Sequence, residues 1–137
     1  MKPEQRLWRV IREHVTLWPK SHWVRIENEV GAGQPDVEYC VDGICGWLEL
    51  KVWPRALERT QVLWSRERIK AGGAVHVLVR VKTALVNNYL LLSVEDYYDS
   101  QRLLGIPGLV LHQLWSLERD GWETLVEKII ERHMDKP

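Results

Sequence analysis

The sequence predicts one α/β (α+β) domain in which helices flank a central mixed β-sheet. Three observations predict this class. Segments with apolar residues at helical spacing alternate along the chain with segments that alternate like strands. Asp42-Gly43 is a strong signal for a two-residue hairpin turn. The length, 137 residues with 45% hydrophobic content, is that of one globular domain with its own core.

The first half of the chain predicts one helix followed by three strands. Apolar residues recur at helical spacing in the first segment, and Pro3 suits a position in a first helical turn. β-branched and aromatic residues alternate with polar ones in the segments that follow. The expected bounds are a helix at 3–16 and strands at 21–28, 37–41 and 44–52.

The second half predicts a helix, two strands and two further helices. Thr60 is a candidate N-cap for the first of these helices, and Gly72-Gly73 would end it. An Asn-Asn turn at 87–88 would open the second of the two strands. The expected bounds are a helix from 57 or 60 to 71, strands at 74–81 and 87–94, and helices at 94–104 and 122–133. We therefore expect a single domain over 1–137, with its core at about 3–93 and a C-terminal helical extension at about 94–137.

Charge is balanced over the chain but unevenly distributed along it. With 19 basic and 19 acidic residues, the net charge is zero, which argues against a globally basic nucleic-acid binder. Residues 26–50 hold six acids and no Lys or Arg, whereas 1–25 and 51–70 each hold six bases against two acids. This pattern would suit a cation site beside surfaces that contact phosphates. Charges that merely solvate exposed faces are the alternative.

Nothing in the sequence predicts export or a membrane span. No run approaches the ~20 apolar residues that a spanning helix needs, and the first ten residues carry charge where a secretory signal would be apolar. The expected location is the cytoplasm, including that of an infected host if the chain is encoded by a phage. Cysteines there are expected to stay reduced.

The hairpin fixes a register that brings acidic residues together. With Asp42-Gly43 as the loop, Asp36 lies opposite Glu49, at the ~4.5–5.5 Å Cβ separation of facing residues. Lys51 lies two residues beyond Glu49 and therefore shares its side of the sheet. The other side carries the residues expected in the core: Val37, Tyr39, Val41, Ile44, Leu48, Leu50 and Val52.

Two carboxylates this close raise each other's pKa unless a cation lies between them. Carboxylate oxygens are the ligands that Mg²⁺ prefers, and the ion can activate water and stabilise charge on a phosphoryl group. A neighbouring lysine could orient that water or neutralise developing negative charge. A cross-strand Glu–Lys network on a solvated surface is the alternative.

The same register places Cys40 opposite Cys45. Packed free thiols are favoured over a zinc site, which would need about two more ligands. Trp47 and Trp53 lie on or beside the charged side of the sheet. Packing against a helix is favoured for them over stacking on a splayed base.

At these residues the chain resembles the PD-(D/E)XK nuclease superfamily. It has "PD" at 35–36 and "ELK" at 49–51, and the elements expected over 3–81 follow the order of the restriction-endonuclease-like core, α-β-β-β-α-β. The segments "RIENEVGAGQPD" and "TQVLWSRERIKAGGAVHVLVRV" look like the corresponding segments of the VRR-NUC branch. Small phage and archaeal Holliday junction resolvases share the plan and the size.

The resemblance implies roles for individual residues. Asp36, Glu49 and the backbone carbonyl of Leu50 would bind Mg²⁺, for which Mn²⁺ could substitute. Lys51 would position the attacking water, and Gln61 would support the site.

The resemblance also implies a further carboxylate from the first helix. Glu4 fits best because it shares the inward stripe of that helix, with Glu27 as the rival. Arg25, Arg55 and Arg59 are candidate phosphate contacts, with a solvated-face role as the alternative.

The function that the resemblance implies is a Mg²⁺-dependent endonuclease that hydrolyses DNA phosphodiester bonds. Branched or junction DNA is the favoured substrate, cut by a homodimer during recombination. A nicking or degradative nuclease on duplex or single-stranded DNA is one alternative. A non-catalytic module that binds nucleic acid or protein is another.

Overall fold

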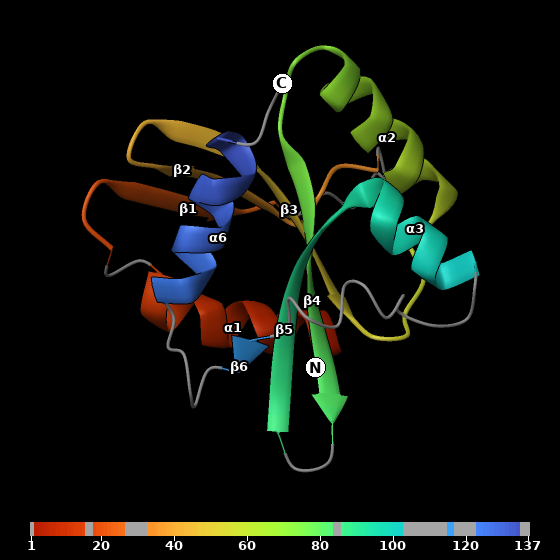
Figure 1. Cartoon of the computed structure of the whole chain (residues 1–137), viewed down its shortest axis with the longest axis horizontal. Helices are drawn as coiled ribbons and strands as arrows, with labels where there is room; N and C mark the ends of the chain where they lie inside the picture. Colours follow the sequence, from red (N-terminus) through yellow and green to blue (C-terminus); the bar gives the residue numbers. More distant parts are fainter. Residues whose placement is uncertain are drawn as a thin grey trace.

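A twisted sheet with helices on both of its faces forms the protein (Figure 1). The computed structural model describes residues 2–15, 18–26, 33–83, 86–102, 115–116 and 123–134. In chain order the elements are α1 (Pro3–Val15), β1 (Ser21–Arg25), β2 (Val37–Val41), β3 (Ile44–Val52), α2 (Arg59–Lys70), β4 (Val75–Thr83), β5 (Val86–Ser93), α3 (Val94–Arg102), β6 (Trp115–Ser116) and α6 (Glu123–Met134).

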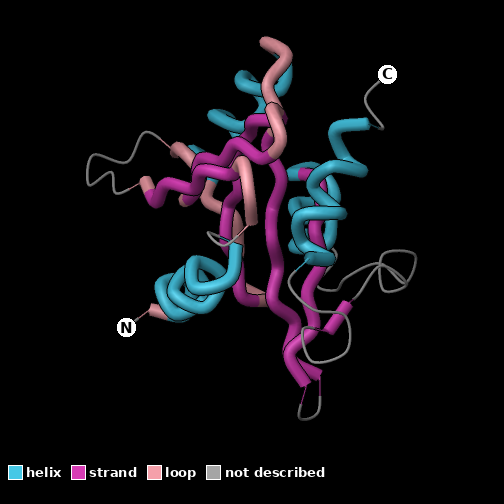
Figure 2. Tube along the Cα trace, turned by 90° about the vertical axis from the view of Figure 1, so that its left-hand side faces the viewer, coloured by secondary structure: helices cyan, strands magenta, loops and turns pink. Residues whose placement is uncertain are grey.

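The strands follow one another in the sheet in sequence order, from β1 to β6. All neighbours are antiparallel except β3 and β4, which are parallel and are connected through α2. The expectation of a mixed sheet in an α/β domain is therefore confirmed. The sheet twists strongly, so that β1 and β2 cross β4 and β5 at a large angle in two perpendicular views (Figures 1 and 2).

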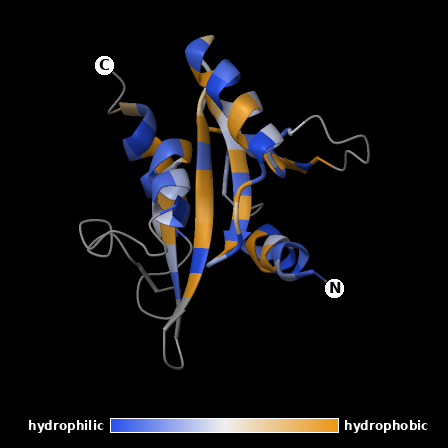
Figure 3. Cartoon of the chain, turned by 90° about the vertical axis from the view of Figure 1, so that its right-hand side faces the viewer, coloured by the Kyte–Doolittle hydropathy of each residue, from blue (hydrophilic) through white to orange (hydrophobic). Residues whose placement is uncertain are grey.

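Two apolar cores lie on opposite faces of this sheet. One joins α1 and α6 to the face that carries Val37, Tyr39 and Leu48, and the other joins α2 and α3 to the face that carries Val77 and Val79. Hydrophobic residues accordingly run along the central strands, while the helices carry hydrophilic residues on their outer sides (Figure 3). Both faces of β3 and β4 are covered, as is usual for parallel strand pairs.

The hairpin between β2 and β3 has the expected register. Val41 pairs with Ile44 and Cys40 with Cys45. Asp42 and Gly43 both have positive φ, 51° and 81°, as a type I′ turn requires.

The expectation of free thiols at Cys40 and Cys45 is wrong, because the two residues form a disulfide. The predicted register itself places the two sulfurs face to face. The prediction of reduced thiols came from the expected compartment and not from this geometry.

Some expected details differ from the structure. Glu58, and not Thr60, is the N-cap of α2, because Gln61 at the third helical position accepts a hydrogen bond from the Glu58 amide. Asn87 and Asn88 lie inside β5, paired with β4, so they do not form the turn that was expected there.

The C-terminal region is not purely helical. β6 adds a short strand beside β5, and Leu125, Val126 and Ile129 of α6 belong to the same core as α1. None of the described helices is long and apolar enough to cross a membrane.

Candidate functional site

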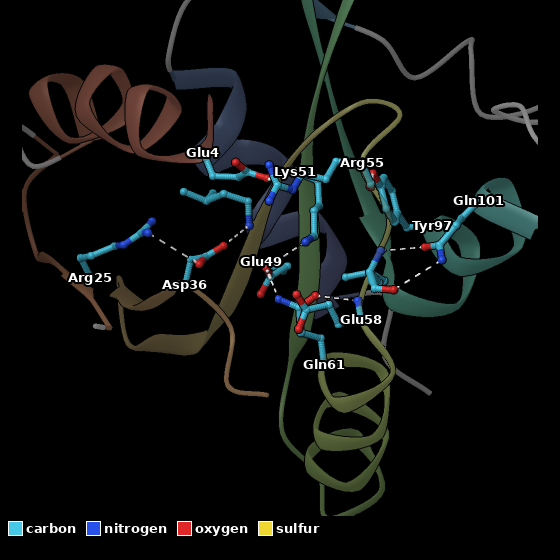
Figure 4. A network of polar contacts seen from close by, with 12 residues as sticks. Glu4, Arg25, Asp36, Glu49, Lys51, Arg55, Glu58, Gln61, Tyr97 and Gln101 are labelled. Carbon is cyan, nitrogen blue, oxygen red and sulfur yellow. Dashed lines mark hydrogen bonds and ion pairs between the residues drawn. The ribbon is translucent and has the colours of Figure 1, made fainter. Parts of the chain in front are cut away.

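Polar side chains gather where β3 runs between β2 and β4 (Figure 4). Asp36 directly precedes β2, and Glu49 and Lys51 belong to β3. Gln61 reaches the same place from the first turn of α2, and Glu4 approaches from α1. The structure thus brings together five residues that the sequence analysis selected for one site.

The Asp36 carboxylate reaches across to β3. Its Oδ2 accepts a hydrogen bond of 2.9 Å from the Leu50 amide, and its Oδ1 lies 3.8 Å from Nη2 of Arg25. Its side chain is 22% exposed. The paired residues of β2 and β3 end at Val37 and Leu48, so Asp36 and Glu49 lie just beyond that pair, where the Asp36 charge acts on Glu49.

Glu49 is the most deeply buried acid of the site, with 3% of its surface exposed. Its Oε1 accepts a hydrogen bond of 2.9 Å from Nε2 of Gln61 and lies 3.7 Å from Nζ of Lys51. Its Oε2 is buried and has no hydrogen-bond partner. A buried carboxylate oxygen without a partner is costly, so this oxygen is a candidate metal ligand.

Burial in this environment raises the pKa of Glu49 to about 9. Loss of solvation is the largest cause, and the neighbouring Asp36 charge adds to it. Lys51 acts in the opposite direction but only partly compensates. In the absence of a further cation, Glu49 is therefore protonated at neutral pH.

Gln61 connects the start of α2 to Glu49. Its Oε1 accepts from the Glu58 amide at 2.9 Å, which leaves its Nε2 to donate to Glu49. The segment before Asp36 also packs tightly here, since a Cβ on Gly33 would lie 2.2 Å from the carbonyl oxygen of Thr60. Gly33 has φ 78°, so only glycine fits this approach without strain.

Glu4 lies at the far side of Lys51 in Figure 4, where its Oε1 forms an ion pair of 3.1 Å with Nε of Arg55. Its side chain is only 12% exposed. Glu27, the rival carboxylate, lies outside the described residues. Within the described ranges, no group of three or more His, Cys, Asp or Glu side chains is arranged to hold a metal ion.

The candidate phosphate contacts have different surroundings. Arg25 faces Asp36, and its Nη1 is buried without a partner. Arg55 is half exposed and is engaged by Glu4. Arg59, the first residue of α2, is exposed.

Two residues of α3 that sequence reasoning missed hold the connection between β3 and α2. The Tyr97 hydroxyl donates to the Arg55 carbonyl oxygen. Gln101 accepts from the Leu57 amide at 2.8 Å and donates to the Leu57 carbonyl at 3.4 Å. No local pattern signals these bonds, because they join segments about forty residues apart. They fix the loop that carries Arg55 beside the carboxylates.

The chain matches no family model, and no curated protein sequence is significantly similar to it.

Proposed function

We propose that this protein is a divalent-metal-dependent endonuclease that hydrolyses DNA phosphodiester bonds. The observation that carries the proposal is the buried Oε2 of Glu49, which has no hydrogen-bond partner although the Asp36 carboxylate lies nearby, bonded to the Leu50 amide. A cation would coordinate that oxygen and offset the repulsion between the two carboxylates. The resemblance of "PD" and "ELK" to the PD-(D/E)XK motif points to the same chemistry.

The donor set fits Mg²⁺ or Mn²⁺. Magnesium in phosphoryl-transfer sites is commonly held by one or two carboxylates, with water and substrate phosphate at its other positions. Asp36 and Glu49 would supply the carboxylates, and the Leu50 carbonyl stays a predicted ligand. Glu4 forms an ion pair with Arg55, so it stays a predicted ligand but a weaker candidate than Asp36 and Glu49. The bound ion would supply charge to polarise the phosphate and to lower the pKa of a water.

Lys51 and Gln61 give the site its remaining chemistry. Lys51 is 5% exposed and its Nζ lies 3.7 Å from Oε1 of Glu49, so the ammonium would hold a water or a phosphate oxygen in a fixed direction. Gln61 would keep Glu49 in one rotamer through its amide, which is itself fixed by the start of α2. Arg55 would be free to contact a phosphate if the substrate displaced it from Glu4.

Branched DNA is the proposed substrate, and a homodimer the proposed working form. Both come from the resemblance to small junction resolvases, because an enzyme that cuts two opposed strands needs two sites related by symmetry. Nicking of ordinary duplex or single-stranded DNA uses the same residues and is therefore the outcome to be separated experimentally.

The test is a gel assay with a four-way junction, its component duplex and its single strands, each in Mg²⁺ and in EDTA. We expect metal-dependent cleavage by the wild-type protein and losses of at least a hundredfold for Glu49→Gln and Lys51→Ala, in line with removal of a positioned polar group from an active site. Arg66→Ala is the control, because Arg66 lies on the outer side of α2 and pairs with Glu95.

Cleavage that survives both substitutions would overturn the proposed mechanism. Equal cleavage of junction, duplex and single strands would remove the junction preference but keep the nuclease. A non-catalytic binding module predicts no cleavage at all and an unchanged metal affinity in Asp36→Asn.

A further inference from the structure

A groove runs along the exposed side of α2. It begins near Glu49 and extends along the helix away from it. Its volume is about 480 Å³. The residues that line it recur one helical turn apart: Thr60, Leu63, Trp64, Glu67, Arg68 and Ala71. Leu63 is 48% exposed although it is apolar.

Trp64 and Arg68 line this groove, and Trp47 contacts both of them. The indoles of Trp47 and Trp64 meet edge to face, with centroids 5.2 Å apart. The Arg68 guanidinium carbon lies 4.8 Å from the centroid of Trp64 and 5.6 Å from that of Trp47. A guanidinium this close to two rings is held by cation–π attraction, and Arg68 remains exposed to solvent.

Arg68 is also held along its aliphatic stem. A Cβ on Gly73 would lie 2.7 Å from its Cγ and Cδ, so the stem packs directly on the backbone that ends α2. Among the described residues, Arg68 forms no ion pair with an acid. Its charge and its planar group are therefore fixed in place but not neutralised.

The groove begins next to the carboxylates. Thr60 lies at its near end, adjacent to Gln61, which bonds to Glu49. Figure 4 shows α2 running away from Glu49 with Gln61 at the near end. Trp47 precedes Glu49 by two residues on the same side of β3, a separation of about 7 Å. A phosphate at Glu49 and the base of an adjacent nucleotide in the groove could therefore belong to the same DNA strand.

We propose that this groove binds an unpaired nucleotide of the substrate, with its base stacked on the Arg68 guanidinium that covers Trp64. This inference rests on the proposed function, since it places the nucleotide beside the phosphodiester that Asp36 and Glu49 would hold. Bases stack well on arginine planes and aromatic rings, and such stacking tolerates any base. The nuclease would consequently favour DNA that offers an unpaired nucleotide near the cut.

The chemistry of the lining favours a base over a phosphate. Among the described residues that line the groove, Glu67 is the one acid, and it would repel a phosphate while accepting a hydrogen bond from a base. Leu63 adds an apolar contact for the ring. A groove of this volume suits a small planar ligand rather than a folded partner.

The test measures binding of a fluorescein-labelled thymidine hexanucleotide by anisotropy in EDTA, so that no cleavage occurs. We expect Arg68→Ala and Arg68→Lys each to weaken Kd about tenfold, the size of one base-stacking contact. Arg68→Lys keeps the charge but loses the planar group. Arg66→Ala is the matched control, because it removes the same charge from the same helix outside the groove and should change Kd less than threefold. An abasic hexanucleotide should bind more weakly than the thymidine one and should not distinguish Arg68→Ala from wild type.

Arg68→Lys binding like wild type, equal losses for Arg66→Ala and Arg68→Ala, or undiminished binding of the abasic strand would each overturn the proposal. These results differ from failure of the proposed nuclease. If the protein cleaves DNA with metal but the Arg68 substitutions do not change Kd, the nuclease proposal stands and the base-binding role of the groove is refuted. If the Arg68 substitutions weaken Kd as expected but no cleavage occurs, the base-binding role of the groove stands and the nuclease proposal is refuted.

Discussion

Replacement of Glu49 by glutamine should make the metal-free protein more stable at neutral pH and less sensitive to pH. Glu49 has a pKa of about 9 in the folded protein against a reference value of 4.5. The folded state therefore binds a proton that the unfolded state has lost at neutral pH. The free energy of unfolding is therefore highest, as far as Glu49 is concerned, below pH 4.5, and it falls as the pH rises toward 9. Glutamine has the same shape and never ionises.

The size of the effect follows from this pKa difference. Between pH 5.5 and 7.5 the free energy of unfolding falls by about 1.4 kcal/mol for each pH unit through this one group. We thus expect wild type to lose about 3 kcal/mol more than Glu49→Gln over that interval. Glu38→Gln is the matched control, because Glu38 is a glutamate on the same hairpin but is exposed.

The assay is urea unfolding of the three proteins in EDTA at both pH values. The difference between the variants at each pH cancels every other titrating group. At pH 7.5, Mg²⁺ at tenfold its Kd should add about 1.4 kcal/mol to wild type and nothing to Glu49→Gln. If wild type and Glu49→Gln respond equally to pH, the assignment of a protonated, buried Glu49 is wrong.

Three further changes test the supports of the site. Gln61→Ala should cost about 1 kcal/mol of unfolding free energy, because α2 loses its capping side chain, and should slow cleavage; unchanged single-turnover rates would mean that Gln61 does not hold the buried carboxylate. Tyr97→Phe should cost about 1 kcal/mol through the lost hydrogen bond to the loop after β3, and thermal unfolding identical to wild type would show that the bond contributes nothing. Loss of the disulfide in a Cys40→Ser, Cys45→Ser protein should cost about 2 kcal/mol for so short a loop. Wild type, but not this variant, should lose that stability in dithiothreitol, and a wild-type protein insensitive to dithiothreitol would contradict the cross-link.

The register at the site could be predicted because a two-residue turn leaves no freedom. Once Asp42 and Gly43 occupy the loop, every pair along β2 and β3 is fixed. Helix bounds were predictable from apolar spacing and from the glycines after α2. These features depend on residues close together in sequence.

Features that depend on distant contacts could not be predicted. The bonds from Tyr97 and Gln101 to the loop before α2 need the fold to bring α3 there. The return of α6 to the core of α1, and the placement of β6 beside β5, likewise follow from the folding of the whole chain. The disulfide depends on oxidation of two facing thiols, which no spacing rule determines.

The burial of Glu49 is a feature of the site that the alternating strand pattern did not predict. An alternating strand with a charged side is expected to expose that side to water, yet Glu49 and Lys51 are 3% and 5% exposed. The cause is the parallel pairing of β3 with β4, since the connecting helix must cross over the sheet and covers the charged side. An amide or apolar side chain at position 49 would remove an unpaired buried oxygen and fold more stably. Stability therefore does not explain an acid at this position, whereas the cation that we propose to bind between Glu49 and Asp36 would.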